Sequence, residues 1–130
     1  MLKKMNEYQK MKTHRQLEEH SWDWFVTIHQ REPDISHQWL LINEAMERLR
    51  EEDENPPLYW FCFSTSGFSQ KPHAHGVIRT SLPRSRVMKL FRECDEPSVK
   101  PIETAERLHE YMLRQALETT ITNINSEVQQ

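Results

Sequence analysis

The stretch LYWFCFSTSGFSQKPHAHGVIRT, residues 58–80, decides the fold of this chain. Its first eight residues are almost wholly apolar, which is typical of a central strand covered on both sides. Residues 66–70 predict a turn, because glycine and serine favour turns. Residues 71–80 predict a second strand, which carries His73 and His75. Side chains two apart on a strand project to the same side, roughly 6.5–7 Å from each other, so both imidazoles can meet one ligand.

Upstream of this stretch, the sequence predicts a strand and a helix. Residues 22–30 (WDWFVTIHQ) alternate, with β-branched and aromatic side chains typical of a strand. Pro33 and Ser36 introduce a helix with one buried stripe, formed by Trp39, Ile42, Met46 and Leu49. The prolines of residues 55–57 end that helix. Residues 1–20 are polar and are expected to form a helix or an arm.

Downstream, residues 85–94 predict a helix and residues 97–102 a short edge strand. Residues 104–119 predict a final helix, with one apolar face formed by Ala105, Leu108, Met112 and Ala116. This order predicts an α+β domain with a central, mostly antiparallel sheet and flanking helices. We expect an N-terminal arm or helix at residues 1–21, the domain at 22–120 and a tail at 121–130.

Length and composition exclude several classes of protein. A chain of 130 residues and 15.7 kDa can build one domain with a real core. Cys62 and Cys94 form no disulfide framework, so a reducing, cytoplasmic compartment is expected. There is no long apolar run, so no membrane partner is expected. No P-loop motif is present, which excludes an ATPase within this chain.

The charges are unevenly distributed, although the net charge is only −3. Residues 55–92 contain no acidic side chain and six basic ones: Lys71, Arg79, Arg84, Arg86, Lys89 and Arg92. This pattern predicts a positive surface beside the histidines that favours DNA or RNA, with a solvated basic helix face as the alternative. We expect four of these residues to contact the DNA backbone, namely Lys71, Arg79, Arg84 and Arg86.

A tyrosine completes the candidate chemistry. Tyr111 and Gln115 lie four apart in the predicted final helix, at one edge of its apolar face. A phenol can attack phosphate as a nucleophile, although its ordinary pKa of about 10 means that something must activate the phenol or neutralise the charge of the phosphate. A metal ion on His73 and His75 would provide that neutralisation.

These residues resemble the HUH endonucleases, and most closely the small viral and plasmid replication initiators, or Rep proteins. The resemblance covers roughly residues 22–118 and depends on three motifs in the family's order. Residues 24–28 look like the first, hydrophobic strand motif, and residues 72–78 are similar to the histidine–hydrophobic–histidine motif. Residues 111–114 look like the Tyr-x-x-Lys motif, with Arg114 in place of lysine.

The resemblance implies a metal-dependent endonuclease that nicks and joins single-stranded DNA. His73 and His75 would hold Mg²⁺ or Mn²⁺, and Tyr111 would attack the scissile phosphate to form a 5′-phosphotyrosine link and a free 3′-hydroxyl. The implied fold is related to the ferredoxin-like fold. The implied partners are single-stranded DNA at an origin or hairpin, and a helicase and polymerase of the host or replicon. A homodimer stays open, as does transposition instead of replication.

Two positions depart from the family pattern. Family members commonly place an acidic ligand on the strand before the histidines, whereas residues 61–66 (FCFSTS) contain no carboxylate. Some single-tyrosine transposases of this superfamily use a polar residue one turn beyond the tyrosine, so Gln115 is the candidate third ligand. Arg114 keeps the positive charge of lysine but cannot exchange protons, which leaves it an electrostatic role.

Other interpretations compete with the nuclease. A histidine-triad hydrolase would need a third histidine at Val77, and a two-histidine phosphoesterase would need a second His-x-Thr or His-x-Ser motif. A structural zinc site would need Cys62 on the face of the histidines. His29 could approach the histidines if its strand neighbours theirs. The main rival is a catalytically silent, HUH-like nucleic-acid-binding or regulatory module, in which aromatic residues such as Trp60 and Phe68 stack on bases.

Overall fold

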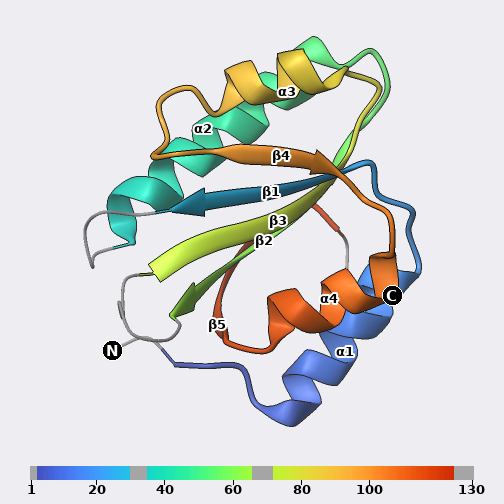
Figure 1. Cartoon of the computed structure of the whole chain (residues 1–130), viewed down its shortest axis with the longest axis vertical. Coiled ribbons are helices and arrows are strands. Elements are labelled where there is room, and N and C mark those ends of the chain that lie inside the picture. Colours follow the sequence, from blue (N-terminus) through green and yellow to red (C-terminus); the bar gives the residue numbers. More distant parts are fainter. Residues whose placement is uncertain (1–2, 30–34, 66–71, 125–130) are drawn as a thin grey trace.

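A five-stranded antiparallel sheet forms the centre of the protein in a computed structural model, which describes residues 3–29, 35–65 and 72–124 (Figure 1). The strand order is β4-β1-β3-β2-β5, and every pair of neighbours runs antiparallel. The strands are β1 (Trp24–His29), β2 (Leu58–Thr65), β3 (Pro72–Arg79), β4 (Ser98–Pro101) and β5 (Ala116–Thr122). The helices of the described residues are α1 (Glu7–Glu18), α2 (Ser36–Glu52), α3 (Arg84–Leu90) and α4 (Ala105–Leu113). The prediction of an α+β domain is confirmed.

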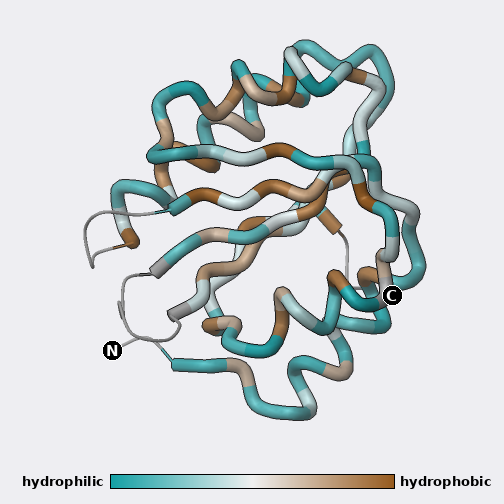
Figure 2. Tube along the Cα trace, viewed as in Figure 1, coloured by the Kyte–Doolittle hydropathy of each residue, from teal (hydrophilic) through white to brown (hydrophobic). Residues whose placement is uncertain are grey.

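The helices cover both faces of the sheet, so the protein has two hydrophobic layers (Figure 1). In the first layer, α2 and α3 pack on side chains of all five strands, including Val26, Phe61 and Ile78. In the second layer, α1 and α4 pack on the opposite face, against Trp60, Val77 and others. The hydropathy of the trace is highest along the central strands and lower on the helices that surround them (Figure 2). The central strands β2 and β3 lie between the two hydrophobic layers and are covered on both faces, which explains why so many of their side chains are apolar.

The N-terminal segment is a helix and belongs to the body of the fold. Asn6 caps α1, because its side chain accepts a hydrogen bond from the Gln9 backbone N–H at 2.8 Å while the Gln9 side chain accepts one from the Asn6 N–H at 2.8 Å. Leu17 of α1 is fully buried in the second layer, together with Met5. Among the described residues, no helix is long and apolar enough to cross a membrane.

The predicted final helix is wrong in its second half. It ends at Leu113, and the chain turns and returns as β5, which begins at Ala116 and crosses the expected domain boundary at residue 120. The residues from 119 to 122 are β-branched and suit a strand. Pairing with β2 supplies β5 with the backbone hydrogen bonds that a continued helix would have supplied, and it covers an edge of β2 that would otherwise be unpaired.

The predicted buried stripe of α2 is wrong at one position. Ile42, Met46 and Leu49 are buried as expected, but Trp39 is 38% exposed and Gln38 is buried in its place. Gln38 is four residues before Ile42, so it continues the stripe on the sheet side of the helix. Its Nε2 donates a hydrogen bond to the backbone oxygen of His29 at 3.5 Å.

One carboxylate holds the turn that follows β3. Asp53, directly after α2, accepts hydrogen bonds from the side chains of Thr80 and Ser81 and from the backbone N–H groups of Ser81 and Asn55. Burial raises the pKa of Asp53, but these hydrogen bonds outweigh burial and lower its pKa to about 2. Asp53 therefore joins α2 to the end of the strand that carries the histidines.

Candidate functional site

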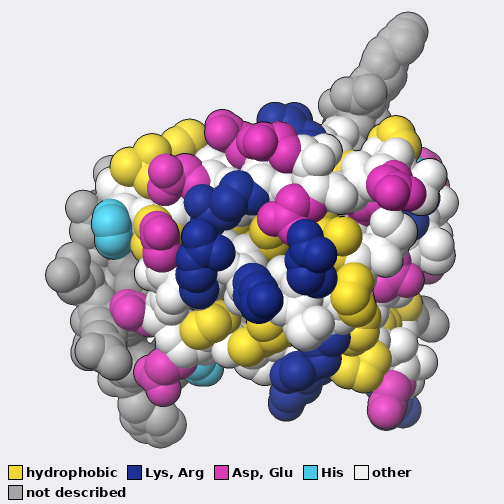
Figure 3. Space-filling model, turned by 90° about the horizontal axis from the view of Figure 1, so that it is seen from above, with side chains coloured by type: hydrophobic (Ala, Val, Ile, Leu, Met, Phe, Trp, Pro, Cys, Tyr) yellow, Lys and Arg dark blue, Asp and Glu magenta, His cyan; other side chains and the backbone are white. Residues whose placement is uncertain are grey.

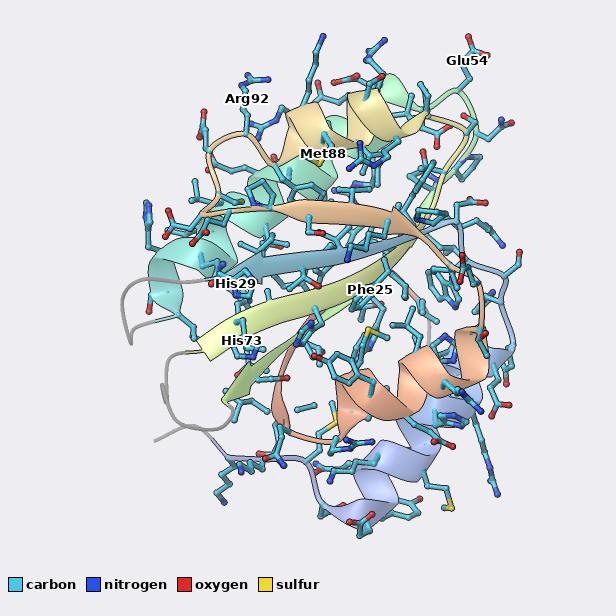
Figure 4. The ribbon with its side chains drawn as sticks, viewed as in Figure 1. Phe25, His29, Glu54, His73, Met88 and Arg92 are labelled. Carbon is cyan, nitrogen blue, oxygen red and sulfur yellow. The ribbon has the colours of Figure 1, made fainter. Side chains whose placement is uncertain are left out.

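The register of the central strands gathers polar side chains on one face of the sheet. His73 lies between His29 of β1 and Ser64 of β2, and His75 lies between Thr27 of β1 and Cys62 of β2. Side chains directly opposite in an antiparallel sheet point the same way, so all of these belong to the face covered by α1 and α4. His29 and His73 stand side by side on neighbouring strands in Figure 4. The expectation that His29 approaches the pair if β1 neighbours β3 is confirmed.

The three histidines form a chain of ring contacts that ends at the tyrosine. The ring centroids of His29 and His73 are 5.9 Å apart, and those of His73 and His75 are 5.2 Å apart. The Tyr111 ring of α4 lies 5.4 Å from the ring of His75, in an edge-on arrangement. Tyr111 is 52% exposed, whereas His75 is buried. The phenol and the paired imidazoles thus share one region of the surface, although they are 36 or more positions apart in the sequence.

His75 is held in a largely apolar environment. Its ring stacks on Phe25 with a centroid distance of 5.8 Å and an interplanar angle of 8°. Burial, together with the nearby His73 and His29, lowers the pKa of His75 from 6.5 to about 4. The imidazole is therefore neutral at pH 7, which is the form that can bind a metal ion or accept a proton.

The fit of a divalent metal ion to this region is partial. Two imidazoles converge, and the buried Nδ1 atom of His75 has no hydrogen-bond partner among the described residues, a deficit that a cation or a water molecule would relieve. However, within residues 3–29, 35–65 and 72–124 no three His, Cys, Asp or Glu side chains are arranged to hold a metal ion. Mg²⁺ and Mn²⁺ prefer oxygen ligands, so the two imidazoles alone would not complete the coordination of either ion.

The structure places Gln115 and Arg114 beyond the end of α4, in the turn before β5. The side-chain oxygen of Gln115 accepts a hydrogen bond of 2.7 Å from the Lys4 ammonium group, so it is engaged with the N-terminal segment. The helical spacing that suggested Gln115 as the third ligand is absent, because the helix ends before it. Arg114 is exposed and lines a groove between α1 and α4.

The expected DNA-contacting residues are divided between the two sides of the sheet. Arg84 and Arg86 belong to α3, which packs on the face opposite the histidines. There Arg84 Nε donates to the backbone oxygen of Val99 at 2.7 Å, and Arg86 forms an ion pair with Glu52. Figure 3 looks down on the side of α2 and α3 and shows Lys and Arg side chains gathered near its centre. Arg79 shares the histidine face but lies at the far end of β3, roughly 13 Å along the strand from His75. Lys71 lies outside the described residues.

Cys62 does share the face of the histidines, opposite His75. Its thiol is fully buried and donates a weak hydrogen bond to the Met112 backbone oxygen at 3.6 Å. Burial raises the pKa of Cys62 to about 12. Cys62 therefore serves packing between β2 and α4.

Phe25 is a neighbour of the site that the sequence pattern had not singled out. The signal was available, because Phe25 has the same strand parity as Thr27 and His29 and so projects to their face. Which strand would lie next to β1 could not be read from that parity.

A solved structure shares this fold. It is the crystal structure of the hypothetical protein ORF119 from Sulfolobus islandicus rod-shaped virus 1, with a TM-score of 0.56 and 17% sequence identity over 81% of this chain and 91% of that chain. No protein-family model matches the sequence, and no curated protein matches it significantly. At this identity, the likeness shows the fold alone.

Proposed function

We propose that this protein is a metal-dependent endonuclease that nicks and joins single-stranded DNA, with Tyr111 as its nucleophile. The observation that carries the proposal is the contact between the rings of Tyr111 and His75, whose centroids are 5.4 Å apart. The imidazole of His73 lies next to that of His75. A half-exposed phenol next to two imidazoles combines a nucleophile with ligands for a cation. Core packing alone would not require a phenol that is 52% exposed.

The chemistry would proceed in two balanced steps. The Tyr111 oxygen attacks the scissile phosphorus and loses its proton to solvent, while the bond between phosphorus and the 3′-oxygen breaks and that oxygen takes up a proton. Tyr111 then carries the 5′-phosphate, and a later attack by a 3′-hydroxyl releases the phenol and rejoins the strand. A divalent ion on His73 and His75 would supply neutralisation of the phosphate charge, worth several kcal/mol.

The surroundings of the pair support parts of this mechanism. Phe25, stacked on His75, fixes the plane of that imidazole. Arg114, three residues after Tyr111, adds exposed positive charge beside α4 that would attract DNA phosphates. Since this chain has no ATPase motif, a partner helicase would open the duplex. The two buried free thiols are compatible with action in a reducing cytoplasm of an infected or plasmid-bearing cell.

A silent DNA- or RNA-binding module is the second candidate. It is favoured by the lack, in the described part of the chain, of three side chains arranged for a metal ion, and by the hydrogen bond that engages Gln115 with Lys4. In that case the histidine face would bind nucleic acid without cleaving it.

A covalent-trapping experiment separates the two candidates. The protein is incubated with Mn²⁺ and a panel of labelled single-stranded oligonucleotides, and adducts that survive denaturing electrophoresis are counted. The nuclease predicts an adduct that Tyr111→Phe abolishes and that Tyr8→Phe, a control at an exposed tyrosine of α1, leaves unchanged. His73→Ala should abolish the adduct while binding persists. Binding without an adduct across the panel would support the silent module, and an adduct that persists in Tyr111→Phe would refute the assignment of the nucleophile.

A further inference from the structure

A second pair of histidines lies apart from the site described above, between α1 and α4. His14 of α1 and His109 of α4 face each other with ring centroids 5.9 Å apart and an interplanar angle of 83°. They are 95 positions apart in the sequence, so only the packing of α1 on α4 brings them together. His109 is 1% exposed and is thus among the most buried polar side chains of the protein.

Three nitrogen atoms of this pair are buried without a hydrogen-bond partner in the described residues: His14 Nε2, His109 Nδ1 and His109 Nε2. An unsatisfied buried polar group destabilises the folded state, and native proteins rarely leave such groups unpaired. A neutral imidazole offers one N–H donor and one lone pair, so His109 has both kinds of group unmet. This concentration of orphaned nitrogens between two helices points to an occupant.

The hydrogen bond of His14 indicates what kind of occupant fits. His14 Nδ1 is 2.7 Å from the Glu18 carboxylate, one turn further along α1. The carboxylate fixes the proton on Nδ1, so the lone pair lies on the buried Nε2 atom. A carboxylate that accepts the far N–H of an imidazole is the usual support behind a metal-binding histidine, because it orients the ring and increases the basicity of the other nitrogen.

The spacing of the rings is also suitable. With metal–nitrogen bonds of about 2.0–2.1 Å and tetrahedral angles, two imidazoles on one ion place their ring centroids roughly 5 Å apart. The observed 5.9 Å exceeds this separation by less than about 1 Å, so the two rings would have to approach each other by that amount on binding one ion.

We infer that His14 and His109 form a site for a borderline divalent ion such as Zn²⁺, which ties α1 to α4. Imidazole nitrogen suits zinc better than it suits Mg²⁺ or Mn²⁺, and because this also holds for the His73–His75 pair, a test of the His14–His109 site has to remove that pair. The protein supplies two ligands, so water would have to complete the coordination; a groove of about 520 Å³ reaches His14 and Glu18, whereas His109 is buried and is not part of its lining. The proposed zinc site does not depend on the nuclease proposal, although His109 lies on α4, the helix that also carries Tyr111.

Charge around the groove is balanced. Glu7, Glu18 and Glu110 line it together with Lys10, Arg15 and Arg114, so acidic groups offset the cations that would repel an ion. Burial of His109 and its closeness to His14 lower its pKa, and the nearby Glu18 opposes this shift.

The test uses the full chain with His73→Ala and His75→Ala, so that the other imidazole pair cannot bind. After removal of metals with a chelator, Zn²⁺ is titrated calorimetrically, and thermal unfolding is followed with and without Zn²⁺. We expect one Zn²⁺ per chain and a rise in the unfolding temperature that Mg²⁺ does not produce. His14→Ala should weaken binding at least tenfold and Glu18→Gln about 10–100-fold. His37→Ala, at an exposed histidine of α2, should bind Zn²⁺ unchanged.

His109→Ala tests the second ligand directly, and circular dichroism shows whether that variant keeps its fold. If it does not fold, His14→Ala and Glu18→Gln decide. Absence of Zn²⁺ binding in the background protein would overturn the inference and leave a buried water molecule as the occupant. Zn²⁺ affinity that is unchanged in both His14→Ala and Glu18→Gln would overturn it as well, because the ion would then bind elsewhere.

Discussion

Gly76, between His75 and Val77 of β3, is required by a close aromatic neighbour. Phe61 of β2 lies directly opposite Gly76 in the register, on the face covered by α2 and α3. A Cβ atom at Gly76 would lie 2.2 Å from Phe61 Cδ2, 2.4 Å from Cε2 and 2.5 Å from Cγ. Ordinary carbon–carbon contacts are about 3.5–4.0 Å, so in Gly76→Ala the ring would have to move by more than about 1 Å.

The ring has little room for that movement. Phe61 is fully buried and its centroid is 5.9 Å from that of Phe91. Overpacking of a filled core costs about 1–3 kcal/mol, and the clash here involves the body of the ring, which favours the upper half of that range. Replacement of glycine within a strand offsets about 0.5–1 kcal/mol of this cost, because the unfolded chain loses freedom. We expect Gly76→Ala to lower the free energy of unfolding by about 2 kcal/mol.

Urea unfolding followed by circular dichroism measures this loss. With a denaturant dependence of about 2 kcal/mol per molar, the midpoint should fall by about 1 M urea. Phe61→Leu removes the ring that clashes, so the double variant should be at least about 1 kcal/mol more stable than the sum of the two single losses predicts. A variant Gly76→Ala as stable as the parent, or additive losses in the double variant, would refute the steric explanation.

Three further predictions follow from the same packing. In metal-free protein, His75 is protonated at about pH 6.5 in the unfolded chain but only near pH 4 in the folded chain. Its contribution to the free energy of unfolding is therefore fully present above pH 6.5, and about 3 kcal/mol is lost as the pH falls toward 4. Urea unfolding at pH 7 and at pH 4.5 should show this loss, and His75→Gln should reduce it. Asp53→Ala removes the acceptor of four hydrogen bonds and should cost about 2–4 kcal/mol at pH 7 in the same assay; a loss below 1 kcal/mol would contradict the role assigned to this carboxylate. Trp39→Ser should change stability by less than about 1 kcal/mol, whereas Ile42→Ala should cost about 2–5 kcal/mol; equal losses would mean that Trp39 is buried after all.

The local sequence was sufficient for elements whose pattern and environment agree. The apolar run of β2 predicted a strand over residues 58–65, and the structure has it with the same bounds. It failed where local and tertiary preferences conflict. Residues 114–119 continue an apolar helical spacing, but the residues from Ala116 onward pair with the edge of β2, which would otherwise be unpaired, and so join the sheet.

The candidate site shows the same division. The spacing of His73 and His75 was enough to place both imidazoles on one side of a strand, because alternation is a local property of extended backbone. It could not show that β1 would bring His29 beside them, nor that α4 would bring Tyr111 against His75. Those contacts depend on strand order and on which face each helix covers.

The sequence by itself determined the type of most elements, the α+β architecture and the shared side of the two imidazoles. Tertiary structure alone decided which groups lie next to these imidazoles, that Arg84 and Arg86 lie on the opposite side of the sheet, and that His14 contacts His109. The physical reason is that backbone alternation and helical periodicity act over a few residues, whereas the choice between the two faces of a sheet depends on burial of apolar surface summed over the whole chain.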